Sequence, residues 1–249
     1  MVLAYLEIPA EFPQARSIFF ILGVYPTQLF LHINVATQKM TQNKYGTLLK
    51  NIISSIQNKY QTDELAYLSL TSKIENPLRD KIAFELQKSI GKDKIVCREW
   101  TNNRLSKSKA DIGILDIYGI PECIIEFKAH SLITGIGEWS NCLIKDIRKN
   151  QELYKQTEMI FVLFANFVNG IPKNQIFNHS IKYYDSISKS VDRKYSLENQ
   201  KESWEKSLTR KNIISDFTNF IIDAGKYQDN RVYINTFIHE NIIINEQNN

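Results

Sequence analysis

The chain has 249 residues, of which 43% are apolar and 23% charged, the balance of a folded globular protein; disordered and collagen-like classes are excluded. Its formal net charge of +4 permits a polyanionic partner without requiring one. The three cysteines are widely spaced and form no C-x-x-C pair, so we expect no disulfide framework, no zinc or redox site, and a location in the reducing cytoplasm. No linker or repeat divides the chain, which predicts a single domain over residues 1–249.

Residues 1–75 are predicted to form an N-terminal extension. The apolar run 18–24 is too short to span a bilayer and has no basic segment before it, so we interpret it as a buried strand and expect no membrane association. Residues 28–35 alternate apolar and polar side chains, which predicts the second strand of a hairpin. Residues 41–60 carry apolar side chains at helical spacing and are predicted to form an amphipathic helix.

The central unit, residues 76–167, has a pattern typical of an α/β fold. Asn76 and Pro77 mark the start of a helix that runs to about residue 90. Three strand-like runs follow, and the last two are joined by a tight turn at Gly119; then come a helical pattern and an unbroken apolar run typical of a strand buried on both faces. The runs cover residues 94–100, 111–118, 122–130, 138–156 and 159–165. The predicted order is αβββαβ, with a central mixed sheet flanked by helices.

Residues 168–249 are predicted to form a C-terminal, mainly helical extension. A helical pattern covers residues 204–222, and short strand-like pieces follow at 232–238 and 242–244.

The predicted hairpin brings three charged side chains to one face of the sheet. A turn centred between Gly119 and the next residue places Asp111 opposite Lys128, and Glu126 then shares their face because side chains alternate along a strand. Asp116 points to the other face by the same rule. Two carboxylates and an ammonium suit Mg²⁺, with Mn²⁺ as a substitute, and a metal so held can activate water against a phosphodiester.

Other residues are expected to assist this cluster. Glu85 falls within the inward stripe of the helix over residues 76–90 and is the candidate third acid; the alternative is that it sits at the edge of the stripe and reaches water, or pairs with a structural lysine. A basic segment leads into Asp111 and is expected to hold a nucleic-acid backbone. The cations of this segment are Arg98, Arg104, Lys107 and Lys109.

The helix over 138–156 and the strand of Lys128 supply further candidates. Asp146 and Asn150 fall on the inward stripe of the helix, and His130 shares the strand face of Lys128, so these three are expected to be supporting groups. Lys145 lies off the stripe and is expected to contact phosphate.

Taken together, Asp111-Ile-Gly-Ile on one strand and Glu126-Phe127-Lys128 on the next resemble the core of the PD-(D/E)XK nuclease superfamily, which has the restriction-endonuclease-like fold. The resemblance covers roughly residues 76–167. It implies that Asp111, Glu126 and the backbone carbonyl of Phe127 are metal ligands, that Lys128 is the catalytic lysine, and that Glu85 is the accessory helix acid. Ala110 stands where the motif has its proline, and the Gln-x-x-x-Tyr of the RecB-like branch is absent from the following helix.

The expected function is Mg²⁺-dependent endonuclease hydrolysis of DNA, first as a type II restriction endonuclease, with a homodimer expected because cutting both strands needs two sites. No nucleotide cofactor is expected. The alternatives are a defence effector or structure-selective nuclease that needs an activator or partner, and a catalytically silent nucleic-acid-binding module of the same fold. A hydrolase that uses Cys123 or Cys142 with His130 is disfavoured, because no nucleophile signature surrounds either cysteine.

Overall fold

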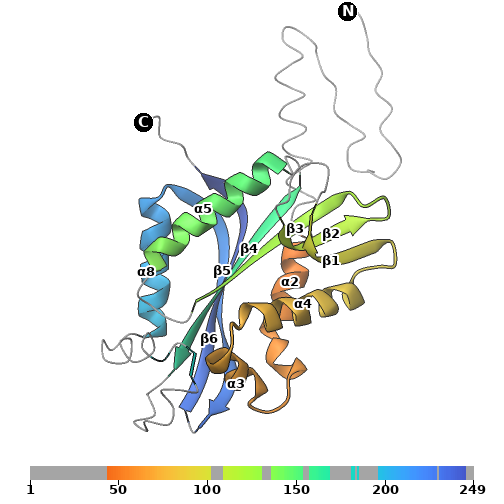
Figure 1. Cartoon of the computed structure of the whole chain (residues 1–249). Coiled ribbons are helices and arrows are strands. Elements are labelled where there is room, and N and C mark those ends of the chain that lie inside the picture. Colours follow the sequence, from red (N-terminus) through yellow and green to blue (C-terminus); the bar gives the residue numbers. More distant parts are fainter. Residues whose placement is uncertain are drawn as a thin grey trace, which may run out of the picture. The chain divides into compact units, whose positions relative to one another are not determined.

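The computed structural model describes residues 44–101, 109–130, 136–153, 157–168, 181, 182, 184, 196–228 and 230–244. The predicted hairpin over residues 18–35 lies outside these ranges. The described part is a mixed α/β structure with a six-stranded sheet flanked by helices (Figure 1). Its strands are β1 (Lys94–Trp100), β2 (Ala110–Asp116), β3 (Pro121–His130), β4 (Glu158–Val168), β5 (Ile213–Tyr227) and β6 (Asn230–Ile244).

The sheet has the order β1-β2-β3-β4-β6-β5. The β3–β4 pair is parallel and every other neighbouring pair is antiparallel. The helix α5 (Ile136–Leu153) makes the crossover between the two parallel strands, as a parallel connection requires. From Ile160 to Ala165 every side chain of β4 is buried, which confirms the prediction of a central strand covered on both faces.

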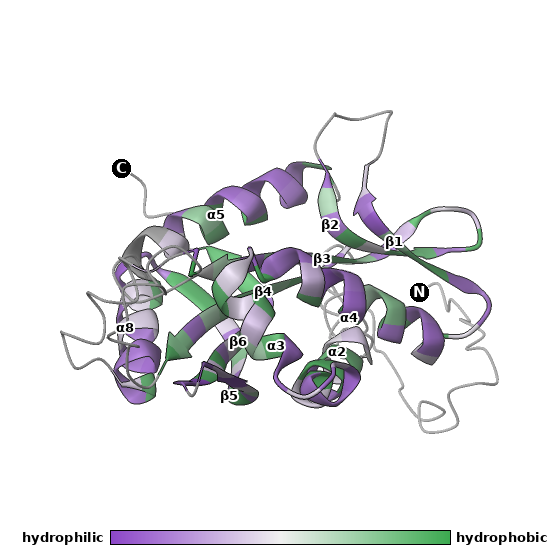
Figure 2. Ribbon diagram, turned by 60° about the horizontal axis from the view of Figure 1, so that its bottom comes forward, coloured by the Kyte–Doolittle hydropathy of each residue, from purple (hydrophilic) through white to green (hydrophobic). Residues whose placement is uncertain are grey.

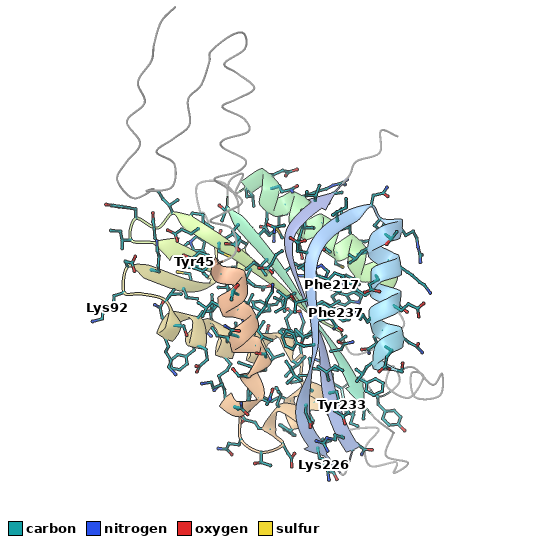
Figure 3. The ribbon with its side chains drawn as sticks, turned by 180° about the vertical axis from the view of Figure 1, so that it is seen from behind. Tyr45, Lys92, Phe217, Lys226, Tyr233 and Phe237 are labelled. Carbon is teal, nitrogen blue, oxygen red and sulfur yellow. The ribbon has the colours of Figure 1, made fainter. Side chains whose placement is uncertain are left out.

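Helices cover both faces of this sheet (Figure 2). On one face α2 (Lys44–Ser54), α3 (Glu64–Thr71) and α4 (Glu75–Ser89) enclose the larger apolar core, to which β3 contributes Ile125 and Phe127. On the other face α5 and α8 (Leu197–Arg210) enclose a smaller core that includes Phe237. Seen from behind, α2 lies in front of the sheet with Tyr45 in its first turn (Figure 3). Because neighbouring residues of a strand face opposite sides of the sheet, the buried side chains of the central strands alternate between the two helical layers.

The order α4-β1-β2-β3-α5-β4 confirms the αβββαβ order expected from the sequence, with boundaries within a few residues of the predicted ones. The predicted helix over 41–60 is α2 followed by a short 3₁₀ helix, Ile56–Lys59. The sequence did not reveal α3. None of the helices in the described ranges combines the length and apolar character needed to cross a bilayer.

In the described part of residues 168–249 two long strands outweigh the single helix α8, so the prediction of a mainly helical C-terminal extension is wrong there. The helical pattern over residues 204–222 is divided: α8 ends at Arg210, Asn212 has a left-handed backbone with φ +53°, and β5 begins at the next residue. The two short strand-like pieces predicted near the end of the chain belong to one strand, β6. It lies between β4 and β5, and pairing on both sides keeps it extended where local sequence alone would interrupt it.

Candidate functional site

The turn between β2 and β3 sets the register of the candidate site. Ile112 lies opposite Ile125, a register two residues away from the predicted one, so continuing the ladder by one residue places Asp111 opposite Glu126 and not opposite Lys128. Asp116 Oδ1 holds the turn by accepting hydrogen bonds from the backbone N–H groups of Tyr118 (2.9 Å) and Ile120 (2.8 Å). Between the turn and the site the pairing shifts by one residue, at an irregularity between Ile114 and Leu115. A shift of two residues leaves every side chain on its predicted face.

Asp111, Glu126 and Lys128 therefore share the face of the sheet that α5 covers, and Asp116 serves the turn. Asp111 Oδ2 accepts a hydrogen bond of 2.8 Å from the backbone N–H of Phe127, which ties the first carboxylate to the strand that carries the second. The Asp111 side chain is 18% exposed and that of Glu126 is 3% exposed. One carboxylate thus borders solvent while the other lies within the protein.

Glu126 is held by two residues of α5. Asn150 Nδ2 donates to Glu126 Oε1 at 2.9 Å, and Lys149 Nζ lies 3.1 Å from the same oxygen. Burial is the main cause that raises the pKa of Glu126, to about 7, against the opposing effects of Asn150 and Lys149; the nearby charges of Asp111 and Asp146 raise it further. Both donors reach Oε1, so among the contacts of the described residues Oε2 is the oxygen that remains for a further ligand.

Lys128 is paired with α5 as well. Its Nζ lies 2.8 Å from Asp146 Oδ2. Burial acts to lower the pKa of Lys128, but the hydrogen bond to Asp146 and the charges of Asp146, Glu126 and Asp111 outweigh it, so the pKa is raised and the side chain is an ammonium. The supporting roles expected for Asp146 and Asn150 thus correspond to direct contacts with Lys128 and Glu126.

The structure brings a different helix acid to the cluster from the one expected. Glu85 pairs with Lys59 (3.2 Å) and Lys88 (3.4 Å), so it has the alternative role expected for it, as the partner of structural lysines. Glu75, in the first turn of α4 and 7% exposed, accepts a hydrogen bond of 3.0 Å from the backbone N–H of Ala129, next to Lys128. The sequence contained a signal for Glu75, because extending the buried stripe of α4 back by one turn reaches it.

The remaining predicted contributors are only partly described. Arg98 is exposed and pairs with Asp80 at 2.9 Å, and Lys109 is exposed and pairs with Glu99 at 3.1 Å. Lys145 is exposed on α5. Arg104 and Lys107 lie outside the described residues, and for His130 the structure describes the backbone alone, paired with β4.

The carboxylates of the cluster restrict which metal ion could bind there. In the described ranges no group of three or more His, Cys, Asp or Glu side chains gathers in a way that could hold one. A Mg²⁺ site needs fewer, because Mg²⁺ takes one or two carboxylates and completes its shell with water and phosphate oxygens. Asp111 and Glu126 supply two carboxylates from neighbouring strands, so the residues fit a Mg²⁺ ion that keeps several water ligands.

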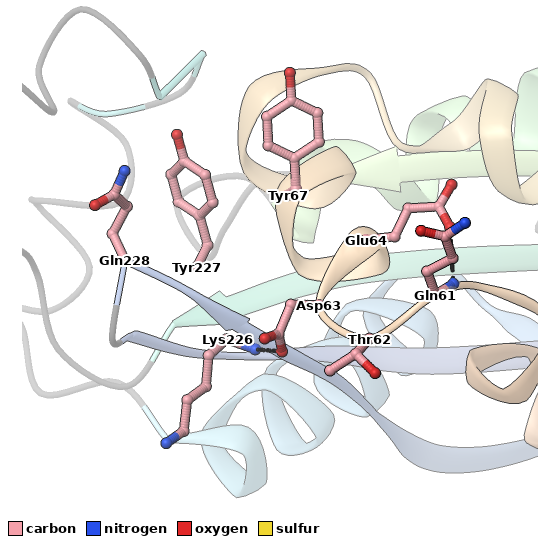
Figure 4. A pocket seen from close by; sticks show the side chains of 8 residues that line it. All are labelled: Gln61, Thr62, Asp63, Glu64, Tyr67, Lys226, Tyr227 and Gln228. Carbon is pink, nitrogen blue, oxygen red and sulfur yellow. Dashed lines mark hydrogen bonds between the residues drawn. The ribbon is translucent and has the colours of Figure 1, made fainter.

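A pocket lies elsewhere on the molecule and contains no residue of this cluster. An open pocket of about 660 Å³ is formed where α3 begins and β5 ends (Figure 4). Tyr67 and Tyr227 stand side by side in it with ring centroids 5.8 Å apart. Asp63 and Glu64 accept hydrogen bonds from backbone N–H groups at the turn, of 2.7 and 2.8 Å, and therefore serve the local backbone. The pocket is thus lined by aromatic and amide side chains, by these two acids and by Lys226.

The cysteine alternative gains no support. Cys123 is fully buried, and burial raises the pKa of its thiol well above the usual value, as expected for an inert core residue. Cys142 is exposed on α5.

Comparison of the chain with protein-family models, with curated proteins and with solved structures gave no match. The candidate function therefore has to be argued from the cluster itself.

Proposed function

We propose that this chain is a cytoplasmic Mg²⁺-dependent endonuclease of the PD-(D/E)XK type that hydrolyses DNA phosphodiester bonds. The observation that carries the proposal is the convergence of Asp111, Glu126 and Lys128 on one sheet face, within helices and strands of the αβββαβ order. A buried carboxylate beside a second carboxylate and an ammonium is a costly arrangement, and such arrangements are concentrated at functional sites.

The residues have separate tasks in this proposal. Asp111 and Glu126, with the backbone carbonyl of Phe127, would hold Mg²⁺ or Mn²⁺. A metal held there would supply Lewis-acid activation of the phosphodiester and would lower the pKa of the attacking water. Lys128 orients that water or the scissile phosphate through its ammonium, and Asp146 fixes the direction of the Lys128 side chain. Glu75 holds the backbone at Ala129, so it positions the strand that carries both Glu126 and Lys128.

The finer form of the proposal is a homodimeric type II restriction endonuclease. Cutting both strands of a duplex needs two such sites, which a symmetric dimer provides. The exposed cations Arg98, Lys109 and Lys145 are the described candidates for contact with the DNA backbone, and contacts of this kind make affinity fall with salt.

A cleavage assay on supercoiled plasmid with Mg²⁺ tests the proposal, with two matched pairs of variants. Asp111→Asn is compared with Asp116→Asn, since both residues lie on β2 and face opposite sides. Lys128→Ala is compared with Lys206→Ala, a lysine on α8 that pairs with Glu202. Activity is expected to disappear with Asp111→Asn, with Lys128→Ala and with EDTA, and to persist in both controls. Discrete fragments indicate a restriction enzyme, while nicking or smearing favours an effector or a structure-selective nuclease.

One observation favours a second candidate, a silent nucleic-acid-binding module of the same fold. Glu126 and Lys128 are both paired within the chain, with Lys149 and with Asp146, so the cluster is electrostatically satisfied without a metal. This candidate would be supported, and the nuclease refuted, if the native protein cleaves DNA under no metal condition and if Lys128→Ala leaves its DNA binding unchanged.

A further inference from the structure

Arg79 is a buried cation at the edge of the cluster that sequence reasoning did not single out. It lies one turn after Glu75 on α4, and its side chain is 10% exposed. Three carboxylates from three elements surround it: Nε lies 3.2 Å from Asp80 on α4, and Nη1 lies 3.5 Å from Glu99 on β1 and 3.6 Å from Asp111 on β2. Because a guanidinium stays charged in proteins, this side chain is a permanent positive charge beside the candidate metal ligand.

Each carboxylate proposed to bind metal already has a cation of the chain beside it. Glu126 faces Lys149, and Asp111 faces Arg79. The negative charges of the two carboxylates are therefore already balanced, and Lys149 and Arg79 would repel a divalent cation that binds beside them. The Arg79–Asp111 contact is the longer of the two and shares its nitrogen with Glu99, so it is the one that a competing partner can replace more easily.

A phosphate group is the natural competitor for Arg79. The guanidinium presents several N–H donors in a rigid fork that matches phosphate oxygens, and its partners Asp80 and Glu99 are largely solvent-accessible, at 41% and 52% side-chain exposure. The exposed cations Arg98 and Lys109 pair with these same two acids, so a DNA backbone held there would pass close to Arg79.

We propose that Arg79 is the resident counter-cation of Asp111, that it weakens binding of divalent metal in the absence of DNA, and that a DNA phosphate withdraws it so that metal loading is coupled to DNA binding. This inference rests on the proposed nuclease function. By linkage, metal must then strengthen DNA binding by the same factor by which DNA strengthens metal binding.

The test measures Mn²⁺ binding by electron paramagnetic resonance of free Mn²⁺, with and without a short DNA duplex. All proteins carry Lys128→Ala to prevent cleavage. Without DNA, adding Arg79→Gln is expected to tighten Mn²⁺ binding on the order of tenfold, which is within the usual range for coupled sites. The duplex should tighten Mn²⁺ binding by a similar factor in the parent and by little in Arg79→Gln. Arg231→Gln is the matched control, since Arg231 is an exposed arginine that pairs with Asp223 on the C-terminal hairpin and has no contact with Asp111 among the described interactions, and it should behave as the parent.

A second measurement covers the case in which Arg79→Gln does not fold. Duplex affinity of the parent is measured with and without Mn²⁺, and it should rise by the factor found for metal binding. The inference is overturned if parent and Arg79→Gln bind Mn²⁺ within twofold of each other, or if the duplex leaves Mn²⁺ affinity unchanged. Plasmid cleavage by the native protein would still support the nuclease in that case. Mn²⁺ binding that is absent from all proteins, or equal in parent and Asp111→Asn, overturns the metal site itself and the inference with it.

Discussion

His239 gives the sharpest prediction of how stability depends on pH. The imidazole on β6 is fully buried, Trp204 Nε1 donates to its Nε2 at 2.8 Å, and Ser215 Oγ lies 2.8 Å from its Nδ1. Since the indole can only donate, Nε2 must be the unprotonated nitrogen, and Nδ1–H then donates to Ser215. A second proton would have to be placed on Nε2, against the N–H of Trp204. The ring is therefore fixed in one neutral form.

The magnitude follows from the pKa difference between the folded and unfolded chain. Burial lowers the pKa of His239 from 6.5 to about 3. The unfolded chain takes up a proton below pH 6.5 and the folded protein does not until about pH 3, so the stability contribution of this residue is present above pH 6.5 and is lost as the pH falls. Each pH unit in that window costs about 1.4 kcal/mol, which gives about 2 kcal/mol between pH 7 and pH 5.

Urea denaturation of the native protein and of His239→Gln tests this prediction. Glutamine keeps a donor and an acceptor but does not titrate, so at pH 7 the variant is expected to be less stable by about 1–3 kcal/mol through lost packing and hydrogen bonding. The gap should narrow by about 2 kcal/mol at pH 5, because only the native protein loses this contribution. Other titrating groups are common to both proteins and cancel in the difference. A gap that stays constant from pH 7.5 to pH 5 would refute the reasoning.

Three further predictions concern other elements. Burial, and secondly the charge of Glu240, raise the pKa of Glu158 to about 8, so the protein loses stability as the pH rises from 4.5 through 8. In urea titrations Glu158→Gln should raise the free energy of unfolding by about 2 kcal/mol at pH 9, after allowance for partial solvent screening, and should change it little at pH 5. Gly225 has φ +97° and an added Cβ would lie 2.5 Å from Asp63 Oδ1, so Gly225→Ala should lower the midpoint of thermal unfolding by several degrees, equivalent to about 1–3 kcal/mol. Ser196 caps α8 by accepting a hydrogen bond from the backbone N–H of Asn199, so Ser196→Ala should cost about 1 kcal/mol, whereas the same substitution at exposed Ser54 should cost less than half of that.

The central elements could be predicted because their local patterns agree with their tertiary surroundings. The stripe of Leu78, Ile82 and Leu86 specifies which face of α4 is buried, and the unbroken apolar run of β4 specifies a strand between two layers. The C-terminal hairpin could not be predicted in the same way. Residues after Arg210 have apolar spacing that fits a helix as well as a strand, and pairing with β4, distant in sequence, decides the outcome.

The candidate site could be predicted where alternation alone decides it. The shared face of Asp111, Glu126 and Lys128 depends only on whether residues are an even or odd number apart, so it survives an error of two residues in the register. The inward stripe of α5 also predicted Asp146 and Asn150, which contact Lys128 and Glu126. The two cations beside the carboxylates could not be predicted in this way. Lys149 and Arg79 reach the two carboxylates from different helices, and nothing in their local sequence distinguishes them from surface cations.

The turn between β2 and β3 restricts how this hairpin can change in length. Adding or removing two residues near Gly119 would slide the strands but keep Glu126 and Asp111 on the α5 side. A change of one residue, unless it were absorbed at the irregularity that already lies between Ile114 and Leu115, would turn Glu126 and Lys128 toward the apolar core under α4 and bring Phe127 to the α5 side. We therefore expect insertions or deletions of two residues at this tip to be tolerated better than changes of one residue. In a library of insertions at the tip, the fraction of folded protein should alternate with the number of added residues.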